Sequence, residues 1–94
     1  MSVRLTRLAI ADLEEAVAYV DAAAGTGDEL LDEVDPAMER LELFPHGAPP
    51  VDGVPGVRRA ALPKFPFGIY YRAEGDELTV LRVLRGRSGG PQPE

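Results

Sequence analysis

Arginine, lysine and tyrosine side chains gather in the second half of the sequence. Residues 58–72, which read RRAALPKFPFGIYYR, hold four of the ten basic residues and four of the six aromatic residues. Guanidinium and ammonium groups can hold a phosphate or pair with a carboxylate, and a phenol can donate a hydrogen bond. Exposed charges are also usual on a solvated surface. Which of these applies depends on the helices and strands that position the groups.

The charge of the chain is divided between its two halves. Residues 1–50 contain eleven acidic and three basic residues, and residues 51–94 contain five and seven, so the halves carry net charges of −8 and +2 within a total of −6. Such a division offers two different surfaces. A general nucleic-acid binder is basic overall, so the composition argues against that class of protein.

The composition also argues against several other kinds of site. Cysteine is absent and His46 is the single histidine, which disfavours disulfides and zinc sites, and we expect neither a metal nor a cofactor. No apolar run approaches the roughly 20 residues of a membrane helix, and the N-terminus does not resemble a secretory signal. We therefore expect a cytoplasmic protein without membrane contact.

Two amphipathic helices are predicted after a short strand at residues 3–5. In the first helix the apolar stripe is Ile10, Leu13, Val17 and Val20, with the acidic residues, Asp12 among them, turned away. In the second the stripe is Leu31, Val34, Met38 and Leu41. Thr26-x-x-Glu29 predicts a capping box at the start of the second helix, and Pro36 predicts a kink or a restart within it.

Three strands are predicted after a loop at residues 45–56 that is rich in proline and glycine. They span residues 57–62, 67–72 and 78–84, the last as a nearly continuous apolar run broken by Arg82. The predicted fold is α+β: an N-terminal strand and an antiparallel helix hairpin packed on one face of a small, mostly antiparallel sheet, in the order β-α-α-β-β-β. We expect a single domain over residues 1–87 and a flexible tail over 88–94.

Alternation along the strand at 67–72 separates core side chains from surface side chains. Phe67, Ile69 and Tyr71, together with Phe65, are predicted to face the helices. The opposite, open face of the sheet would then carry the polar side chains Arg59, Tyr70, Arg72 and Arg82. These four are either solvated surface residues or a functional group.

This order of elements, with these residues, resembles the RelE/ParE superfamily of bacterial toxin-antitoxin toxins. The resemblance covers nearly the whole chain. It is carried by Ala11-Asp12-Leu13-Glu14-Glu15, Tyr19-Val20, Leu41-x-x-Phe44-Pro45-x-Gly47, Gly56-Val57-Arg58-Arg59, Phe65-Pro66-Phe67-x-Ile69-x-Tyr71-Arg72 and Leu81-Arg82-Val83-Leu84-x-Gly86.

The resemblance implies one of two activities. RelE-like members cut messenger RNA on the ribosome with clustered Arg and Lys side chains and a proton-transferring Tyr, His or Glu. The residues of this chain that would form such a site are Arg59, Lys64, Arg72, Arg82 and Arg85. ParE-like members inhibit DNA gyrase and are not known to need a nuclease site. Both kinds are neutralised by an antitoxin protein.

We expect a ParE-like gyrase inhibitor, because no Tyr or His follows Tyr71 and the helices are acidic. The expected partners are a cognate antitoxin, in a hetero-oligomer, and DNA gyrase. The residues expected to bind a partner are Arg59, Tyr70, Arg72, Val80, Arg82 and Leu84. Two alternatives stay open: a RelE-like ribosome-dependent endoribonuclease acting on mRNA, and a non-toxic protein that keeps the toxin fold as an interaction module. Whether the chain is an enzyme depends on this choice.

Overall fold

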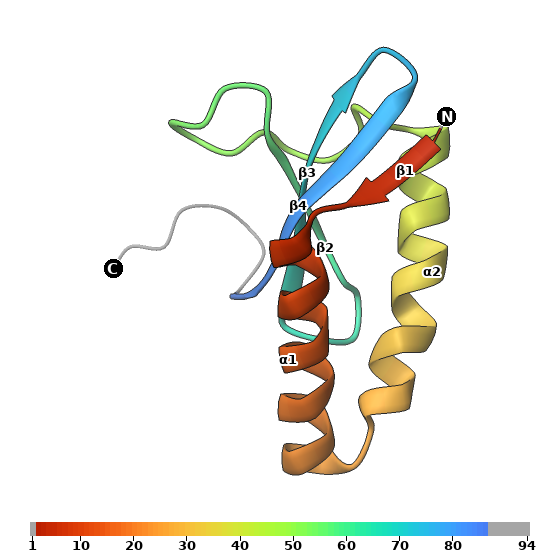
Figure 1. Cartoon of the computed structure of the whole chain (residues 1–94), viewed down its shortest axis with the longest axis vertical. Helices are drawn as coiled ribbons and strands as arrows, with labels where there is room; N and C mark the ends of the chain where they lie inside the picture. Colours follow the sequence, from red (N-terminus) through yellow and green to blue (C-terminus); the bar gives the residue numbers. More distant parts are fainter. Residues whose placement is uncertain (1, 87–94) are drawn as a thin grey trace.

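Six elements make up the computed structural model, which describes residues 2–86. They are β1 (Ser2–Leu5), α1 (Arg7–Ala24), α2 (Gly27–Leu43), β2 (Arg58–Ala61), β3 (Phe67–Glu74) and β4 (Glu77–Arg85), as Figure 1 shows. The predicted α+β class and the order β-α-α-β-β-β are both confirmed. The tail predicted at residues 88–94 lies outside the described residues.

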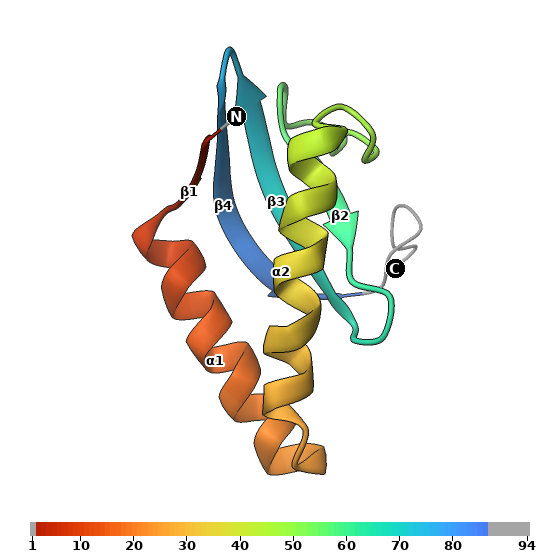
Figure 2. The same cartoon turned by 90° about the vertical axis from the view of Figure 1, so that its right-hand side faces the viewer.

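The four strands form one mixed sheet in the order β1-β4-β3-β2. β1 pairs in parallel with β4, and the two other neighbouring pairs are antiparallel. The parallel pair arises because both helices lie between β1 and the other strands in the sequence, and a parallel pair requires such a crossover. Figure 2 shows the two helices side by side in front of the sheet, so that the opposite face of the sheet is left open.

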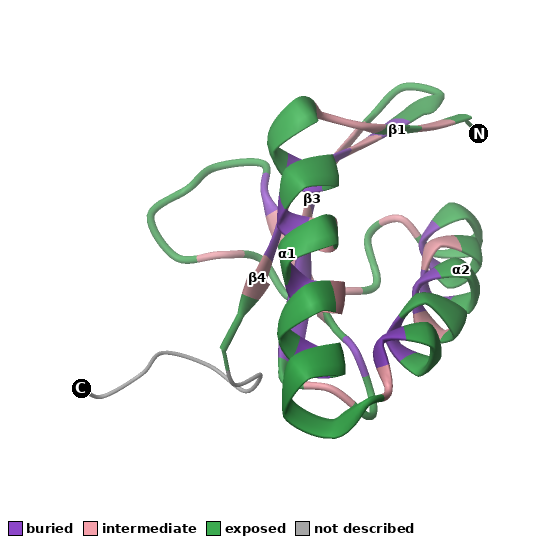
Figure 3. Ribbon diagram, turned by 60° about the horizontal axis from the view of Figure 1, so that its bottom comes forward, coloured by how far each residue is buried: buried purple, intermediate pink, exposed green. Residues whose placement is uncertain are grey.

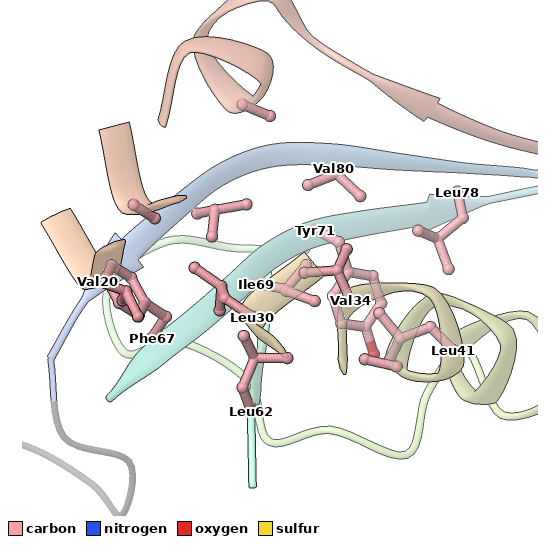
Figure 4. Close-up of a cluster of buried hydrophobic side chains, with 14 residues drawn as sticks. Val20, Leu30, Val34, Leu41, Leu62, Phe67, Ile69, Tyr71, Leu78 and Val80 are labelled. Atoms are coloured by element: carbon pink, nitrogen blue, oxygen red, sulfur yellow. The ribbon is translucent and has the colours of Figure 1, made fainter. Parts of the chain in front are cut away.

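The core lies between this helix layer and the sheet. Ala9, Asp12, Ala16 and Val20 are the buried residues of α1, and Gly27, Leu30, Val34, Ala37 and Leu41 are those of α2. Figure 3 shows that the buried positions of α1 and α2 follow one side of each helix, whereas the outer sides are exposed. Figure 4 shows side chains of both helices meeting those of β3 and β4, with Ile69 and Tyr71 near the centre.

The predicted helix stripes are partly wrong. Ile10 is 47% exposed and Leu31 is 43% exposed, whereas the shorter side chains of Ala9, Ala16 and Ala37 are buried. The prediction selected larger apolar side chains for the buried stripe. In the structure alanines occupy several of the buried positions instead, because a small side chain allows a helix to approach the sheet closely. Asp12, predicted to point outward, is only 9% exposed.

The starts of the two helices also differ from the prediction. The Thr6 hydroxyl caps α1 by accepting a hydrogen bond from the Ala9 N–H at 3.1 Å, and it donates to the Leu81 carbonyl at 2.9 Å. Thr26 precedes α2, but its side chain makes no capping hydrogen bond, so the predicted capping box is wrong. Pro36 lies inside α2, which continues from Gly27 to Leu43 without a restart.

A register shift between β3 and β4 decides which side chains face the helices. Tyr70 lies opposite Arg82 and Tyr71 lies opposite Val80, so Leu81 is an extra residue in β4. This is a β-bulge, which lets side chains on both sides of it keep the same inward orientation. Val80 and Val83 are consequently both buried against the helices although they are three residues apart.

The loop between α2 and β2 is tied to the sheet by hydrogen bonds. The Tyr71 hydroxyl donates to the Pro45 carbonyl at 2.8 Å, and the Arg58 guanidinium donates to the Ala48 carbonyl at 2.7 Å. Burial raises the pKa of Tyr71 above its usual value of 10.0, so the phenol keeps the proton that it donates.

Within the described residues, no helix is long and apolar enough to cross a membrane.

Candidate functional site

The open face of the sheet brings together four of the predicted site residues, Arg59, Tyr70, Arg72 and Leu84. Arg59 of β2 lies opposite Tyr70 of β3 in the register of the sheet, and Arg72 lies two residues further along β3 on the same face. Leu84 of β4 lies opposite Gly68. Arg59, Tyr70, Arg72 and Leu84 are half-buried, and Gly68 is buried.

Arg59 is held in one position by the groups around it. Its Nε donates to the Tyr70 hydroxyl at 3.2 Å, and its Nη2 donates to the Gly86 carbonyl at 2.8 Å. Its Cζ lies 5.6 Å from the centre of the Tyr70 ring, within the range of a cation–π contact. The guanidinium crosses the sheet above Gly68, where a Cβ atom would come within 2.4 Å of the Arg59 Cζ. The missing side chain of Gly68 therefore makes the space that the guanidinium occupies.

We expect Gly68→Ala to displace the Arg59 side chain without unfolding the protein. The atoms that a methyl group would meet belong to the end of a flexible side chain, which can move away. Arg59 would then lose two hydrogen bonds, at a cost of about 1–2 kcal/mol in the free energy of unfolding. Urea unfolding of this variant and of Arg59→Ala checks the prediction. If the two substitutions do not act through the same contact, their effects will add in the double variant.

Arg72 differs from Arg59 because no group among residues 2–86 accepts a hydrogen bond from its Nε. This atom is buried, and it has no hydrogen-bond partner. Arg72 lies opposite Thr79 of β4, and its Nε lies 3.7 Å from the position that a Cβ atom would take on Gly56 in the loop before β2. The loop and the strands thus cover part of the guanidinium without offering an acceptor to Nε.

Arg82 is turned toward α1, where it pairs with Asp12. Its Nε and Nη2 donate to the two carboxylate oxygens of Asp12 at 2.7 and 3.0 Å, and Asp12 also accepts from the Val83 N–H at 3.0 Å. The hydrogen bonds from Arg82, the largest favourable effect, hold the pKa of Asp12 below its usual 3.8. Asp12 raises the pKa of Arg82 in turn. Arg82 lies opposite Tyr70 in the register of the sheet, as expected for the open face, but its guanidinium is engaged by Asp12 of α1.

Val80 does not share a face with Arg82, contrary to the sequence-based expectation. Its exposed fraction is 0%, and it packs among the core side chains beneath the helices. The bulge at Leu81 is the reason, because strict alternation along β4 would place residues 80, 82 and 84 on the same face. Val80 therefore cannot contact a partner that docks on the folded sheet.

The remaining two candidates lie away from the open face. Lys64 is exposed in the turn between β2 and β3, where its backbone N–H donates a hydrogen bond to the Glu33 carboxylate of α2 at 3.3 Å. It lines a hollow of about 420 Å³ with Glu29, Asp32, Glu33, Pro36, Arg40 and Pro63. Arg85 lies opposite Phe67, on the helix side of the sheet, and its Cζ lies 4.5 Å from the centre of the Tyr19 ring.

Asp12 and Tyr19 were missed as site residues by the sequence reasoning. Both lie on α1 and are seven residues apart, close to two helical turns, so they share the side of α1 that meets Arg82 and Arg85. The Arg85 guanidinium donates a hydrogen bond to the Tyr19 hydroxyl. The spacing was available as a signal in the sequence, but only the packing of α1 on β4 identifies the arginines that these residues meet.

Comparisons with known proteins agree with the fold. The sequence model of a family described as the ParE toxin of the type II toxin-antitoxin system, parDE, matches residues 3–89. Among solved structures, the chain is similar to one from the chromosomal ParDE toxin-antitoxin system of P. aeruginosa, with 29% sequence identity and a TM-score of 0.80. The match covers 93% of this chain and 97% of that chain. A search of curated protein sequences gave no match.

Proposed function

The chain belongs to the ParE toxin family of type II toxin-antitoxin systems, and from this premise we propose that it is a toxin that inhibits DNA gyrase by binding to it and that a cognate antitoxin neutralises it. The observation that carries the choice of a binder over a nuclease is the scatter of the basic side chains. A phosphodiester-cleaving site needs its charge-stabilising and proton-transferring groups around one phosphate.

The five residues of the nuclease alternative lie in different parts of the molecule. Arg59 and Arg72 lie on the open face of the sheet, and Lys64 lies against α2. Arg82 is paired with Asp12 at the side of α1, and Arg85 packs on Tyr19 on the helix side. This arrangement supports a protein whose arginines hold the fold and contact a partner.

An antitoxin partner is supported by the similar solved structure, which comes from a ParDE toxin-antitoxin system. The open face, with its arginines and half-buried Tyr70 and Leu84, suits a segment that carries both acidic and apolar side chains. We therefore propose that toxin and antitoxin form a hetero-oligomer.

One observation favours the RelE-like endoribonuclease as a second candidate. Two tyrosine hydroxyls lie beside arginines, Tyr70 beside Arg59 and Tyr19 beside Arg85. A tyrosine next to a cation could transfer a proton in the cleavage of RNA. This candidate makes the arginines essential, which the following experiment tests.

We expect growth arrest by the chain to survive Arg85→Ala and Lys64→Ala with less than about a fivefold change in potency, because an exposed charge contributes only about 0–1 kcal/mol to an interface. In a nuclease, loss of a group that stabilises the transition state costs about 10²–10³ in rate. The measurements are induction of the chain alone in a bacterial host, plasmid linearisation by purified gyrase, and primer extension on cellular messages.

Three results would contradict the proposed function. Message cuts that disappear in either variant, with gyrase unaffected, would replace the gyrase proposal with the endoribonuclease. A wild-type chain that causes no arrest and affects neither gyrase nor messages would favour a non-toxic interaction module. Arrest that persists when the antitoxin is co-expressed would contradict neutralisation.

A further inference from the structure

Arg72 contributes the only buried side-chain nitrogen or oxygen without a hydrogen-bond partner in the part of the chain that the structure describes. Buried polar groups are nearly always paired, and a donor on a charged guanidinium is among the most costly to leave unpaired. A guanidinium with an unpaired donor is therefore a candidate to bind an acceptor that comes from outside the chain.

The other arginines of the open face and its rim already have acceptors. Arg59 donates to Tyr70 and Gly86, and Arg82 donates to Asp12. At the edge of the same face, Arg4 of β1 lies 3.5 Å from the Glu77 carboxylate.

No carboxylate among the described residues lies within 4.0 Å of the Arg72 guanidinium, although Glu74 follows it on the same face of β3. Arg72 therefore leaves an uncompensated positive charge near the middle of the sheet.

We propose that Arg72 pairs with a carboxylate of the antitoxin, and that an acidic, partly apolar segment of that protein lies across the open face. This inference rests on the proposed function for the identity of the partner. Arg72 is half-buried, so a partner on the open face can reach the exposed part of its planar guanidinium, whose shape matches a carboxylate. The half-buried Tyr70 lies two residues away on β3, and Leu84 lies further along the same face opposite Gly68, so both can meet apolar side chains of the same segment.

A protein segment fits this surface better than a nucleic acid does. The exposed carboxylates of Glu74 and Glu77 lie at the end of the same face, where they would repel a continuous phosphate backbone. The chain also carries a net charge of −6. A short segment with one or two well-placed carboxylates avoids this repulsion.

The test uses Arg72→Gln and, as a matched control, Arg4→Gln on the same face of the sheet. The probe is the purified antitoxin protein encoded with the toxin, titrated into the full chain by calorimetry. We expect Arg72→Gln to weaken binding by at least about 30-fold, since it truncates one partner of a shielded charge pair. Arg4→Gln should change the affinity by less than about threefold, because Arg4 is exposed at the edge and already paired.

Thermal unfolding of the free chain distinguishes this role from a structural one. Because Arg72 Nε has no hydrogen-bond partner among the residues that the structure describes, Arg72→Gln should leave the Tm unchanged or raise it. A Tm lowered by several degrees would make Arg72 a structural residue and overturn the proposal. An affinity within threefold of wild type would also overturn it.

A magnetic resonance measurement identifies the acceptor class directly. In isotope-labelled chain, the guanidinium signals of Arg72 should shift when the antitoxin is added, because a carboxylate bound to the guanidinium changes their surroundings. If a short single-stranded RNA produces that shift and the antitoxin does not, the face binds nucleic acid and the proposal is wrong. Toxicity does not enter these measurements, so a chain that fails to inhibit gyrase can still confirm or refute the role of Arg72.

Discussion

Ile69→Ala is expected to lower the free energy of unfolding by about 2–5 kcal/mol, the usual cost of emptying a packed site of an isoleucine. The exposed fraction of Ile69 is 0%, and the residue lies on β3 between Ala60 of β2 and Val83 of β4 in the register of the sheet. Its side chain faces the helices near Leu30 and Phe67 (Figure 4). The neighbouring strands on both sides and the helices above limit how far the structure can close around the cavity that the substitution leaves. A loss of stability in the upper half of this range is therefore expected.

The matched control is Leu43→Ala at the end of α2. Leu43 is also a large aliphatic residue but is 73% exposed, so its truncation should change the free energy of unfolding by less than about 0.5 kcal/mol. Urea unfolding followed by circular dichroism measures both variants. An unchanged midpoint for Ile69→Ala would show that β3 does not present this face to the helices.

This face of β3 could be predicted because its residues alternate without interruption. Phe67, Ile69 and Tyr71 are all buried, as their period of two indicates. The extra residue of the bulge lies in β4, so the alternation along β3 is unaffected. The order of elements could be predicted for a similar reason, since proline, glycine and changes of periodicity separate them.

The bulge itself could not be predicted from the sequence. Val80, Leu81 and Arg82 read as one apolar run with a single charge, and nothing local marks Leu81 as the extra residue. The shift becomes defined only when β4 pairs with β3 and both Val80 and Val83 pack under the helices. The assignment of Val80 to the open face was wrong for this reason.

The partners of individual arginines depend on distant parts of the chain. Arg82 and Asp12 are 70 residues apart, and Arg85 and Tyr19 are 66 residues apart. An acidic residue on a predicted helix is usually solvated, so periodicity alone placed Asp12 outside. Only the packing of α1 against the side of β4 brings these pairs together.

Asp12→Ala is expected to destabilise the fold by about 1–3 kcal/mol, because it leaves the Val83 N–H without an acceptor. β1 pairs with β4 only as far as Val80, so beyond that residue the outer edge of β4 has no neighbouring strand. Asp12 takes the place of a strand there by accepting from the Val83 N–H, and it holds α1 against the edge through Arg82. Its loss removes the acceptor and the attachment together.

The pH dependence of this effect has a definite sign. The folded-state pKa of Asp12 lies below its usual 3.8, so the unfolded chain binds the proton more tightly. The contribution of Asp12 is therefore present above about pH 4 and is lost as the pH falls through the folded-state pKa. The difference in stability between wild type and Asp12→Ala should accordingly be full at neutral pH and shrink below about pH 4.

Two variants separate this contact from general effects of charge. Glu14→Ala removes an exposed carboxylate two residues along the same helix and should change stability little at any pH. Asp12→Asn keeps an oxygen acceptor for the Val83 N–H but loses the ion pair with Arg82, so its stability should lie between those of wild type and Asp12→Ala. Urea unfolding from neutral pH to about pH 3 compares all four proteins across the window in which the carboxylate titrates. Equal destabilisation by Glu14→Ala and Asp12→Ala would mean that net charge, and not the contact with β4, accounts for the effect.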